Sequence, residues 1–279
     1  MVMSPPLVIL ILCAAAMHAT WNALMRSSED RLASITMMSI FSAAVAALFC
    51  VLLLPPLSAP AWPFVLGSAA IQVAYCVVLA RAYTHGALSH VYPLARGAAP
   101  LLVALGALIA AGERPSLAEL AGLGLVSGGV GGIALGSGRL QLHATISALC
   151  VGALIAAYMV VDGMGVRLSA NPPSYIAWLM VALGLPMPLV YRVMRGRWPR
   201  IGKDAETIKS FAGGLLGLAG YGIVVWAMSG EQMARVSGLR ETSILFATII
   251  GIVFLKEPLT GNRLVSAAAI TAGVVCLTA

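Results

Sequence analysis

Charged residues are scarce in this sequence: Asp, Glu, Lys and Arg together make up 10% of its 279 residues, whereas 60% are hydrophobic. A soluble domain carries about 25% charged residues because water must wet its surface. So few charges cannot cover the outside of a 28.7 kDa globule, and most of that outside must therefore face lipid. The mean hydropathy of +0.96 agrees. The composition predicts an integral membrane protein.

Reactive and metal-binding motifs are scarce as well. The five cysteines fall inside apolar runs and none forms a CxxC or a Cys/His cluster, so we expect neither disulfides nor a metal site. No HExxH zinc motif is present. We predict no cofactor and no catalytic residue. The net charge of +7 is explained by loops that set membrane topology, so we expect no nucleic-acid partner.

Apolar segments separated by charged or proline-rich breaks recur ten times along the chain. A helix needs about 20 mostly apolar residues to cross the roughly 30 Å of hydrocarbon in a bilayer. We therefore predict an all-α membrane protein of about ten transmembrane helices. The predicted helices cover residues 6–25, 33–54, 63–83, 87–111, 117–136, 145–166, 174–191, 209–229, 233–255 and 261–279.

Lys and Arg are distributed unevenly among the loops. The loops after odd-numbered segments hold twelve of them, and the loops after even-numbered segments hold three. Basic residues concentrate in cytoplasmic loops. We therefore predict that the odd-numbered loops are cytoplasmic and that both termini lie outside. The expected location is the inner membrane of a bacterial-type cell.

An internal repeat appears when the chain is shifted against itself by 144 residues. The shift pairs Arg96 with Arg240 and Glu113 with Glu257. Matches among aliphatic residues are expected by chance in so apolar a sequence, whereas Arg and Glu are rare here. The two matched charges are therefore the evidence for a duplication.

The same shift sets His18 against Asp162. It predicts two units, residues 1–139 and 140–279, of five helices each. Because five is odd, the second unit must be inverted relative to the first. Inverted repeats are common in secondary transporters, which bind substrate near the bilayer midplane between the halves. Duplication also builds channels and other membrane proteins, and that alternative stays open.

Small residues recur every fourth position in segment 117–136, and segment 261–279 has small residues at the shifted positions. Such ridges let helix backbones approach closely in lipid. We expect them to pack within the chain or to form a homodimer. The ridge residues are Gly124, Gly128, Gly132 and Gly136, with Ala268, Ala272 and Cys276.

Two arginines are predicted to lie inside the membrane. Arg96 and Arg240 each sit about 10–14 Å below the surface at which their helix enters. A charge there costs at least about 2.5 kcal/mol unless a partner or a cavity receives it. Two compatible explanations stay open: pairing with Asp162 or Glu241, and binding of a substrate carboxylate or phosphonate by the guanidinium fork. Glu113 and Glu257 are expected to be structural residues at helix ends.

Two prolines, Pro93 and Pro100, bracket Arg96. Each removes a backbone hydrogen bond and can kink a helix. A transporter exposes backbone groups to its cavity where a helix is broken. We therefore predict a break in segment 87–111 beside Arg96.

Polar and aromatic side chains on the other predicted helices complete the candidate site. His18 titrates closest to neutral pH, and either it or Asp162 is a candidate for proton uptake during transport, although a lone buried histidine is more often only hydrogen-bonded. Gln72 lies on the same predicted helix as Tyr75, and Tyr221 lies on the same predicted helix as Trp226. The candidate substrate-binding residues are His18, Trp21, Asn22, Tyr75, Arg96, Tyr158, Asp162, Trp226, Arg240 and Glu241.

Four stretches of sequence resemble the EamA-like branch of the drug/metabolite transporter superfamily. They are His18–Arg26 (HATWNALMR), Pro93–Leu102 (PLARGAAPLL), Gly112–Pro115 (GERP) and Leu239–Thr260 (LRETSILFATIIGIVFLKEPLT). The resemblance covers essentially the whole chain. It implies a ten-helix inverted-repeat fold. It also implies a central cavity lined by the first, third, fourth, sixth, eighth and ninth helices.

The leading hypothesis is a secondary transporter that exports a small polar or anionic metabolite, such as an amino acid, by alternating access. Coupling to a proton or to an exchanged solute is expected to drive it. One alternative is an intramembrane enzyme acting on lipid head groups, since Asp162-Gly163 and Arg167 faintly resemble a phospholipid head-group transferase signature; the further aspartates of that signature are missing. Another alternative is a non-transporting membrane scaffold.

Overall fold

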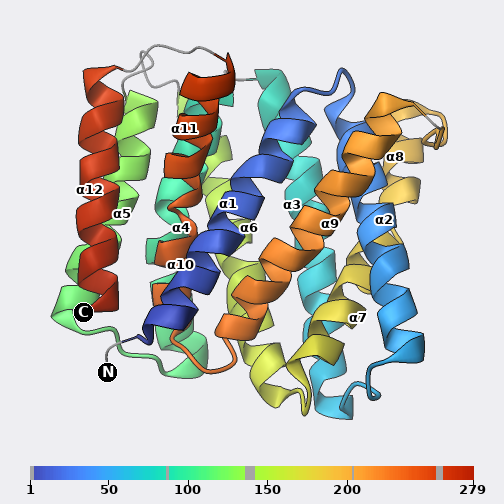
Figure 1. Cartoon of the computed structure of the whole chain (residues 1–279), viewed down its shortest axis with the longest axis horizontal. Helices are drawn as coiled ribbons and strands as arrows, with labels where there is room; N and C mark the ends of the chain where they lie inside the picture. Colours follow the sequence, from blue (N-terminus) through green and yellow to red (C-terminus); the bar gives the residue numbers. More distant parts are fainter. Residues whose placement is uncertain (1–2, 86–87, 136–141, 203, 256–259) are drawn as a thin grey trace.

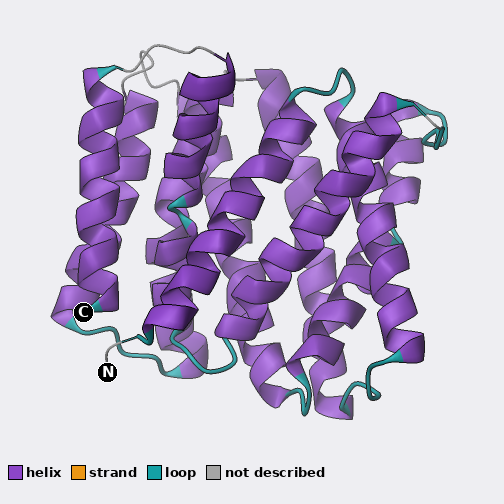
Figure 2. Cartoon of the chain, in the orientation of Figure 1, coloured by secondary structure: helices purple, strands orange, loops and turns teal. Residues whose placement is uncertain are grey.

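The computed structural model describes residues 3–85, 88–135, 142–202, 204–255 and 260–279. Within these ranges the chain is helical, with short connecting loops and no strand (Figure 2). Nine helices in the described ranges are long and apolar enough to cross a membrane, and the apolar stretch Leu117–Gly132 is shorter. The structure thus confirms an all-α membrane protein of about ten spans.

The helices follow the predicted apolar segments closely. Two of the predicted spans are each made of two consecutive helices, α7 with α8 and α10 with α11. A single 3-10 turn, η1 (Ala59–Ala61), precedes α3. The helices are α1 (Pro5–Arg26), α2 (Arg31–Leu52), α3 (Trp62–His85), α4 (Leu88–Ala111), α5 (Leu117–Leu135), α6 (Leu142–Leu168), α7 (Pro172–Gly184), α8 (Met187–Arg195), α9 (Ala205–Ala227), α10 (Met233–Arg240), α11 (Ser243–Leu255) and α12 (Gly261–Thr278).

The broken helix lies in a different span from the predicted one. Helix α4 continues through Pro93 and Pro100 without interruption, so the prediction of a break beside Arg96 was wrong. Prolines are tolerated in membrane helices where neighbouring groups satisfy the released backbone carbonyls. The break occurs instead at Glu241 and Thr242, between α10 and α11.

Both termini lie at the same end of the bundle, as an even number of spans requires (Figure 1). We call this end the even-loop end, because it carries the loops at 53–58, 112–116, 169–171 and 228–232. The opposite end carries the α1–α2 and α8–α9 loops and is called the odd-loop end. The bundle is widest in the plane of Figure 1, with α5 and α12 at one edge and α2 and α8 at the other.

Contacts between the two predicted units hold the bundle together. Helix α1 packs against α9 and α11, and helix α6 packs against α3 and α4. Helix α2 packs against α7 and α9, and α5 packs along α12. The two units therefore interlock through most of their helices.

The α5–α12 interface depends on glycines other than those of the predicted ridge. A Cβ added to Gly129 would lie 2.9 Å from the Ser266 carbonyl oxygen, and one added to Gly122 would lie 2.9 Å from the Gly273 carbonyl oxygen. Gly122 and Gly129 are seven residues apart, or about two turns, so they share one stripe of α5. The backbones of α5 and α12 meet along this stripe.

The predicted ridge lies mostly elsewhere on these helices. A Cβ on Gly124 or Gly128 would meet nothing within 4 Å, and one on Gly132 would touch only the Ser266 hydroxyl, at 3.4 Å. Gly136 lies outside the described residues. On α12, Ala268 and Ala272 are exposed and Cys276 is half-buried. The ridge therefore faces outward over Gly124 and Gly128, because a spacing of four residues follows a different line on α5 from a spacing of seven.

Candidate functional site

A cavity of about 150 Å³ lies between the two halves of the bundle. Residues from α1, α2, α3, α6, α7, α9 and α10 line it. The lining differs from the one that the resemblance implied, since α4 is absent and the second and seventh spans contribute. Its polar and aromatic residues are His18, Trp21, Ser39, Ser42, Gln72, Tyr75, Tyr158, Tyr221 and Arg240.

Five of the ten predicted site residues meet at this cavity: His18, Trp21, Tyr75, Tyr158 and Arg240. Their aromatic rings form a connected wall. The Tyr158 ring centroid lies 5.9 Å from that of Tyr75 and 5.9 Å from that of Tyr221, each in an edge-to-face arrangement. Such edge-to-face pairs are a favoured geometry of aromatic rings. The cavity thus offers several ring faces and hydroxyls around one guanidinium group.

Arg240 is the cation of the cavity. It ends α10 directly before the helix break, and its side chain is buried. Its guanidinium carbon lies 5.3 Å from the Tyr221 ring centroid, a cation–π contact, and its Nη1 atom donates to the Met159 sulfur at 3.3 Å. Among the described residues, no carboxylate oxygen lies within 4.0 Å of its nitrogen atoms. The groups in direct contact with Arg240 thus include a neutral aromatic ring and a sulfur, while the carboxylates act on it only from a distance.

Arg96 has a different environment although it occupies the equivalent position in the repeat. Its Nε atom lies 2.9 Å from a carboxylate oxygen of Glu241, and its Nη2 atom donates to the Ser243 hydroxyl at 3.0 Å. All three residues are buried, and neither Arg96 nor Glu241 lines the cavity. The ion pair joins α4 to the α10–α11 junction, which is the structural pairing that the sequence left open.

Asp162 lies just behind the cavity wall. It is fully buried on α6 and accepts hydrogen bonds from Tyr175, at 3.0 Å, and from Tyr221. Tyr221 itself lines the cavity. Asp162 therefore contacts the candidate site through one tyrosine and does not face the space itself.

The His18 imidazole is a buried polar group in the cavity wall. Its Nε2 atom is buried and has no hydrogen-bond partner among the residues that the structure describes. Its ring packs edge-to-face on Trp21, with centroids 5.0 Å apart. An unpaired buried nitrogen is costly unless a ligand or water reaches it. His18 is thus placed to contact whatever occupies the cavity.

Two predicted residues lie away from the cavity. The Asn22 side chain donates to the His18 backbone carbonyl at 3.0 Å, a bond within α1. Trp226 is 44% exposed and borders an apolar groove formed with α1, α2 and α7. Its position near the end of α9 suits a side chain that faces the bilayer interface.

Several lining residues carried no signal in the sequence. They are small or apolar, and nothing distinguishes them from ordinary packing residues. Gly213 and Gly214 let α9 approach α2: a Cβ on Gly214 would lie 2.7 Å from the Met38 carbonyl oxygen. The close spacing of glycines in α9 was the one available hint. The residues are Ile35, Met38, Cys76, Met180, Leu183, Gly213, Gly214 and Gly217.

The cavity is displaced toward the odd-loop end. Ile35 lies four residues, or about 6 Å, from the start of α2 at that end. At the even-loop end the nearest lining residue is Tyr221, six residues or about 9 Å from the end of α9. The wall therefore extends closer to the odd loops.

Two ion pairs, one half-exposed and one buried, join helices at the even-loop end. Arg167 of α6 lies 2.6 Å from Glu113, whose carboxylate also accepts from the Met233 amide at 2.9 Å. Arg235 of α10 lies 2.9 Å from Glu119 of α5. Each pair joins the first half of the chain to the second. This agrees with the structural role expected for Glu113; its repeat partner Glu257 lies outside the described residues.

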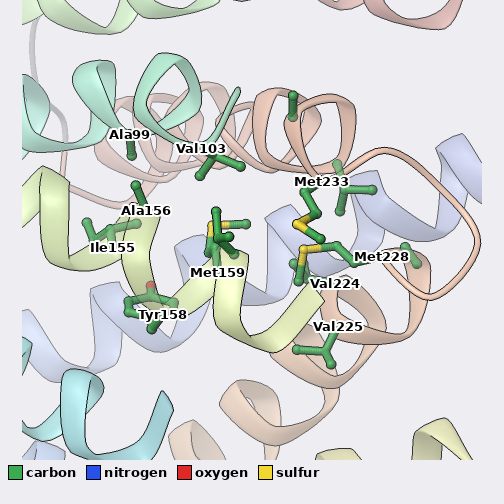
Figure 3. Close-up of a cluster of buried hydrophobic side chains, with 14 of the residues drawn as sticks. Ala99, Val103, Ile155, Ala156, Tyr158, Met159, Val224, Val225, Met228 and Met233 are labelled. Carbon is green, nitrogen blue, oxygen red and sulfur yellow. The ribbon is translucent and has the colours of Figure 1, made fainter. Parts of the chain in front are cut away.

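An apolar cluster fills the space between the cavity and these ion pairs. Met159, Met228 and Met233 meet beside Val224, and Val103 of α4 packs onto the same cluster (Figure 3). Met233 begins α10 at the even-loop end. The structure is thus packed solid on the even-loop side of Arg240.

The fold and the cavity define the class of protein: a multi-pass helical membrane protein whose two halves enclose a polar central space. Residues 143–279 match the model of the EamA-like transporter family. This match confirms, for residues 143–279, the family that the sequence resembles.

Comparison of the whole fold extends the similarity to nearly the full chain. A solved structure described only as "Crystal structure of protein" is similar to this one with a TM-score of 0.76. The match covers 98% of this chain and 95% of that chain, at 17% identity, so it shows a shared fold alone. Comparison with curated proteins finds no match.

Proposed function

We propose that this protein is a secondary transporter that exports a small polar metabolite carrying an anionic group, such as the carboxylate of an amino acid, by alternating access. One observation carries the proposal: the cavity between the halves contains a buried arginine with no carboxylate in ion-pair contact among the described residues. The match of residues 143–279 to a transporter family supports it. A guanidinium fork in such a space suits a carboxylate or another planar anion.

The packing supports two inverted units, residues 1–139 and 140–279. Exchanging the two sets of five spans turns the contact of α1 with α9 into that of α6 with α3, and the contact of α1 with α11 into that of α6 with α4. The α5–α12 and α2–α7 contacts map onto themselves. The family model begins at residue 143, close to the proposed boundary.

The repeat supports an anionic substrate through a difference directly after its two arginines. Arg96 is followed by Gly97, whereas Arg240 is followed by Glu241. Glu241 pairs directly with Arg96 and acts on Arg240 only at longer range, and the repeat equivalent of Glu241 is Gly97. A Cβ on Gly97 would lie 3.0 Å from the Ser127 carbonyl oxygen, so α5 leaves no room for a side chain there. We infer that the substrate supplies the missing negative charge.

The position of the cavity supports an inward-facing conformation. The basic loops lie at the odd-loop end, and the positive-inside rule favours a cytoplasmic location of that end in a bacterial-type cell. The cavity is displaced toward that end, while ion pairs close the other. A solute entering from the cytoplasm would reach Arg240, and opening of the even-loop end would release it outside.

The proposal is tested in two stages with the full-length protein. First, the purified protein is screened for thermal stabilisation by carboxylates, amino acids, phosphonates and organic cations, because a ligand stabilises the folded state by mass action. Second, counterflow of each stabilising compound is measured in proteoliposomes. Arg240→Gln is compared with Arg114→Gln, a matched change at an exposed arginine.

We expect stabilisation by anions, counterflow of the same compounds, and a loss of at least tenfold in Arg240→Gln but not in Arg114→Gln. Stabilisation by cations alone would overturn the anionic substrate. Binding without counterflow would overturn transport and favour a receptor or scaffold.

A further inference from the structure

Asp162 differs from the other carboxylates buried deep in the bundle. Glu241 and Glu119 each have an arginine nitrogen at 2.9 Å. Asp162 has only neutral donors: the hydroxyls of Tyr175 and Tyr221, and that of Ser68. Among the described residues, no Lys or Arg nitrogen lies within 4.0 Å of it. In hydrocarbon a carboxylate must be balanced by a cation or by a proton.

Among the described residues around Asp162, one cation remains that can balance its charge at longer range. On α4, Arg96 is already held by Glu241. On α10, Arg240 acts on Asp162 through space. Neutral polar groups from the helices packed on α6 also face this region: Ser68, Gln72, Tyr75 and Cys76 of α3, Tyr175 of α7, Tyr221 of α9, and Tyr158 of α6 itself. His18 of α1 is a further titratable group in the same cavity, and Glu241, next to Arg240, is paired with Arg96.

Tyr221 connects Asp162 to the cavity cation. Its hydroxyl donates to Asp162, its ring lies 5.3 Å from the Arg240 guanidinium carbon, and it lines the cavity. An anion that neutralises Arg240 therefore removes the positive charge that favours ionised Asp162. The ionised form of Asp162 is then less stable, and the carboxylate takes up a proton that reaches it from solvent through the cavity.

Resting on the proposed function, we propose that Asp162 is the proton-binding site of this transporter, coupled through Tyr221 to the charge at Arg240. Each anion that binds at Arg240 is accompanied by one proton on Asp162, and both leave together. The net charge of the site is then the same when empty and when loaded. Because linkage is reciprocal, protonation of Asp162 strengthens anion binding by the same factor.

The coupling is testable without knowing the substrate. The purified full-length protein is titrated with acid and base while the infrared C=O band of protonated carboxyl groups is recorded. Asp162→Asn identifies the contribution of Asp162 by its disappearance. Arg240→Gln imitates a neutralised arginine, and Arg114→Gln is the matched control at an exposed arginine.

We expect a carboxyl band that is absent in Asp162→Asn and that appears at a pH about one unit higher in Arg240→Gln, the scale on which a nearby charge acts. Tyr221→Phe keeps Asp162 but removes a donor to its charged form, so the band should again appear at higher pH. Arg114→Gln should leave it unchanged. If Asp162→Asn does not fold, the Arg240 and Tyr221 variants still decide the question.

A titration unaffected by Arg240→Gln would overturn the coupling, and a band that survives in Asp162→Asn would overturn the proton site. Either result leaves the counterflow experiment untouched. Conversely, a coupled titration in a protein that shows no counterflow would contradict the proposed transport but not the proton site.

Discussion

The Nε atom of Arg96 lies 2.9 Å from a carboxylate oxygen of Glu241, so that α4 in the first half is tied to the helix break in the second. Both side chains are almost completely buried. Buried ion pairs are costly to break from one side only, because the surviving charge is left unpaired in a medium of low dielectric constant. The pair therefore holds the two halves in register beside the cavity.

Removing both partners of this pair should destabilise the protein by less than the two single removals added together. We expect Arg96→Met and Glu241→Gln each to cost about 3–5 kcal/mol, and the double variant to cost clearly less than their sum. Thermal unfolding in detergent measures the difference, with Arg31→Gln at an exposed arginine as the control. Strictly additive losses would show that the two side chains do not interact.

The α5–α12 interface should discriminate between neighbouring glycines. Gly129→Ala places a Cβ 2.9 Å from the Ser266 carbonyl oxygen and should cost about 1–3 kcal/mol by overpacking. Gly128→Ala adds a Cβ that meets nothing within 4 Å and should be neutral in the isolated chain. Thermal unfolding of the two variants side by side is the measurement. Equal stabilities would contradict the packing described for this interface.

Asp30 should make stability depend on pH at the odd-loop end. It caps α2 by accepting from the Leu32 and Ala33 amides, and Arg195 of α8 lies 3.2 Å away. Partial burial raises the pKa of Asp30, but the hydrogen bond from Ala33 and the Arg195 charge outweigh it, so its pKa is lowered overall. A lowered folded-state pKa stabilises the protein above the unfolded value of about 3.9.

That stabilisation is lost as the pH falls below about 3.9 and through the folded-state pKa. Asp30→Asn retains a capping side chain but removes the charge. We therefore expect it to be less stable than the parent at pH 7, with the gap closing below about pH 3.9. Unfolding temperatures recorded from pH 7 to pH 3 test this, with Glu29→Gln as the exposed neighbour. A gap that is independent of pH would assign the effect to geometry and not to charge.

The ion pairs at the even-loop end should control which end of the protein is open. Glu113→Gln removes the charge that pairs with Arg167 while keeping an acceptor for the Met233 amide. We expect the variant to open this end more often. Limited proteolysis of the 228–232 loop should be at least severalfold faster than in the parent, whereas Glu206→Gln, in an exposed pair at the other end, should not change it.

Much of the fold follows from scarcity of charge. Charged or proline-rich breaks divide the sequence into ten apolar segments. All ten appear as helices within a few residues of the predicted bounds. The break at Glu241 could not be predicted, because it depends on an ion pair to a distant helix. The prolines of α4 pointed to the wrong span, since the packing around a proline decides whether a helix breaks there.

The candidate site was predicted only in part because the repeat makes Arg96 and Arg240 look equivalent. Which of them faces the cavity depends on residues 97 and 241, whose contacts with α5 and α4 exist only in the folded bundle. Rare polar residues such as His18 and Tyr158 were found by their type. Apolar lining residues such as Met38 and Cys76 could not be, because packing requires the same residue types.

The most direct test of the account is the accessibility of Cys76, a native cysteine in the cavity wall. A variant that keeps Cys76 as its only cysteine is placed in sealed vesicles and treated with a membrane-impermeant thiol reagent from one face at a time. We predict reaction from the face that carries the odd loops, slowing when a stabilising ligand is added, and little reaction from the other face. Equal reaction from both faces, or from neither, would contradict a central chamber that opens to one side of the membrane at a time.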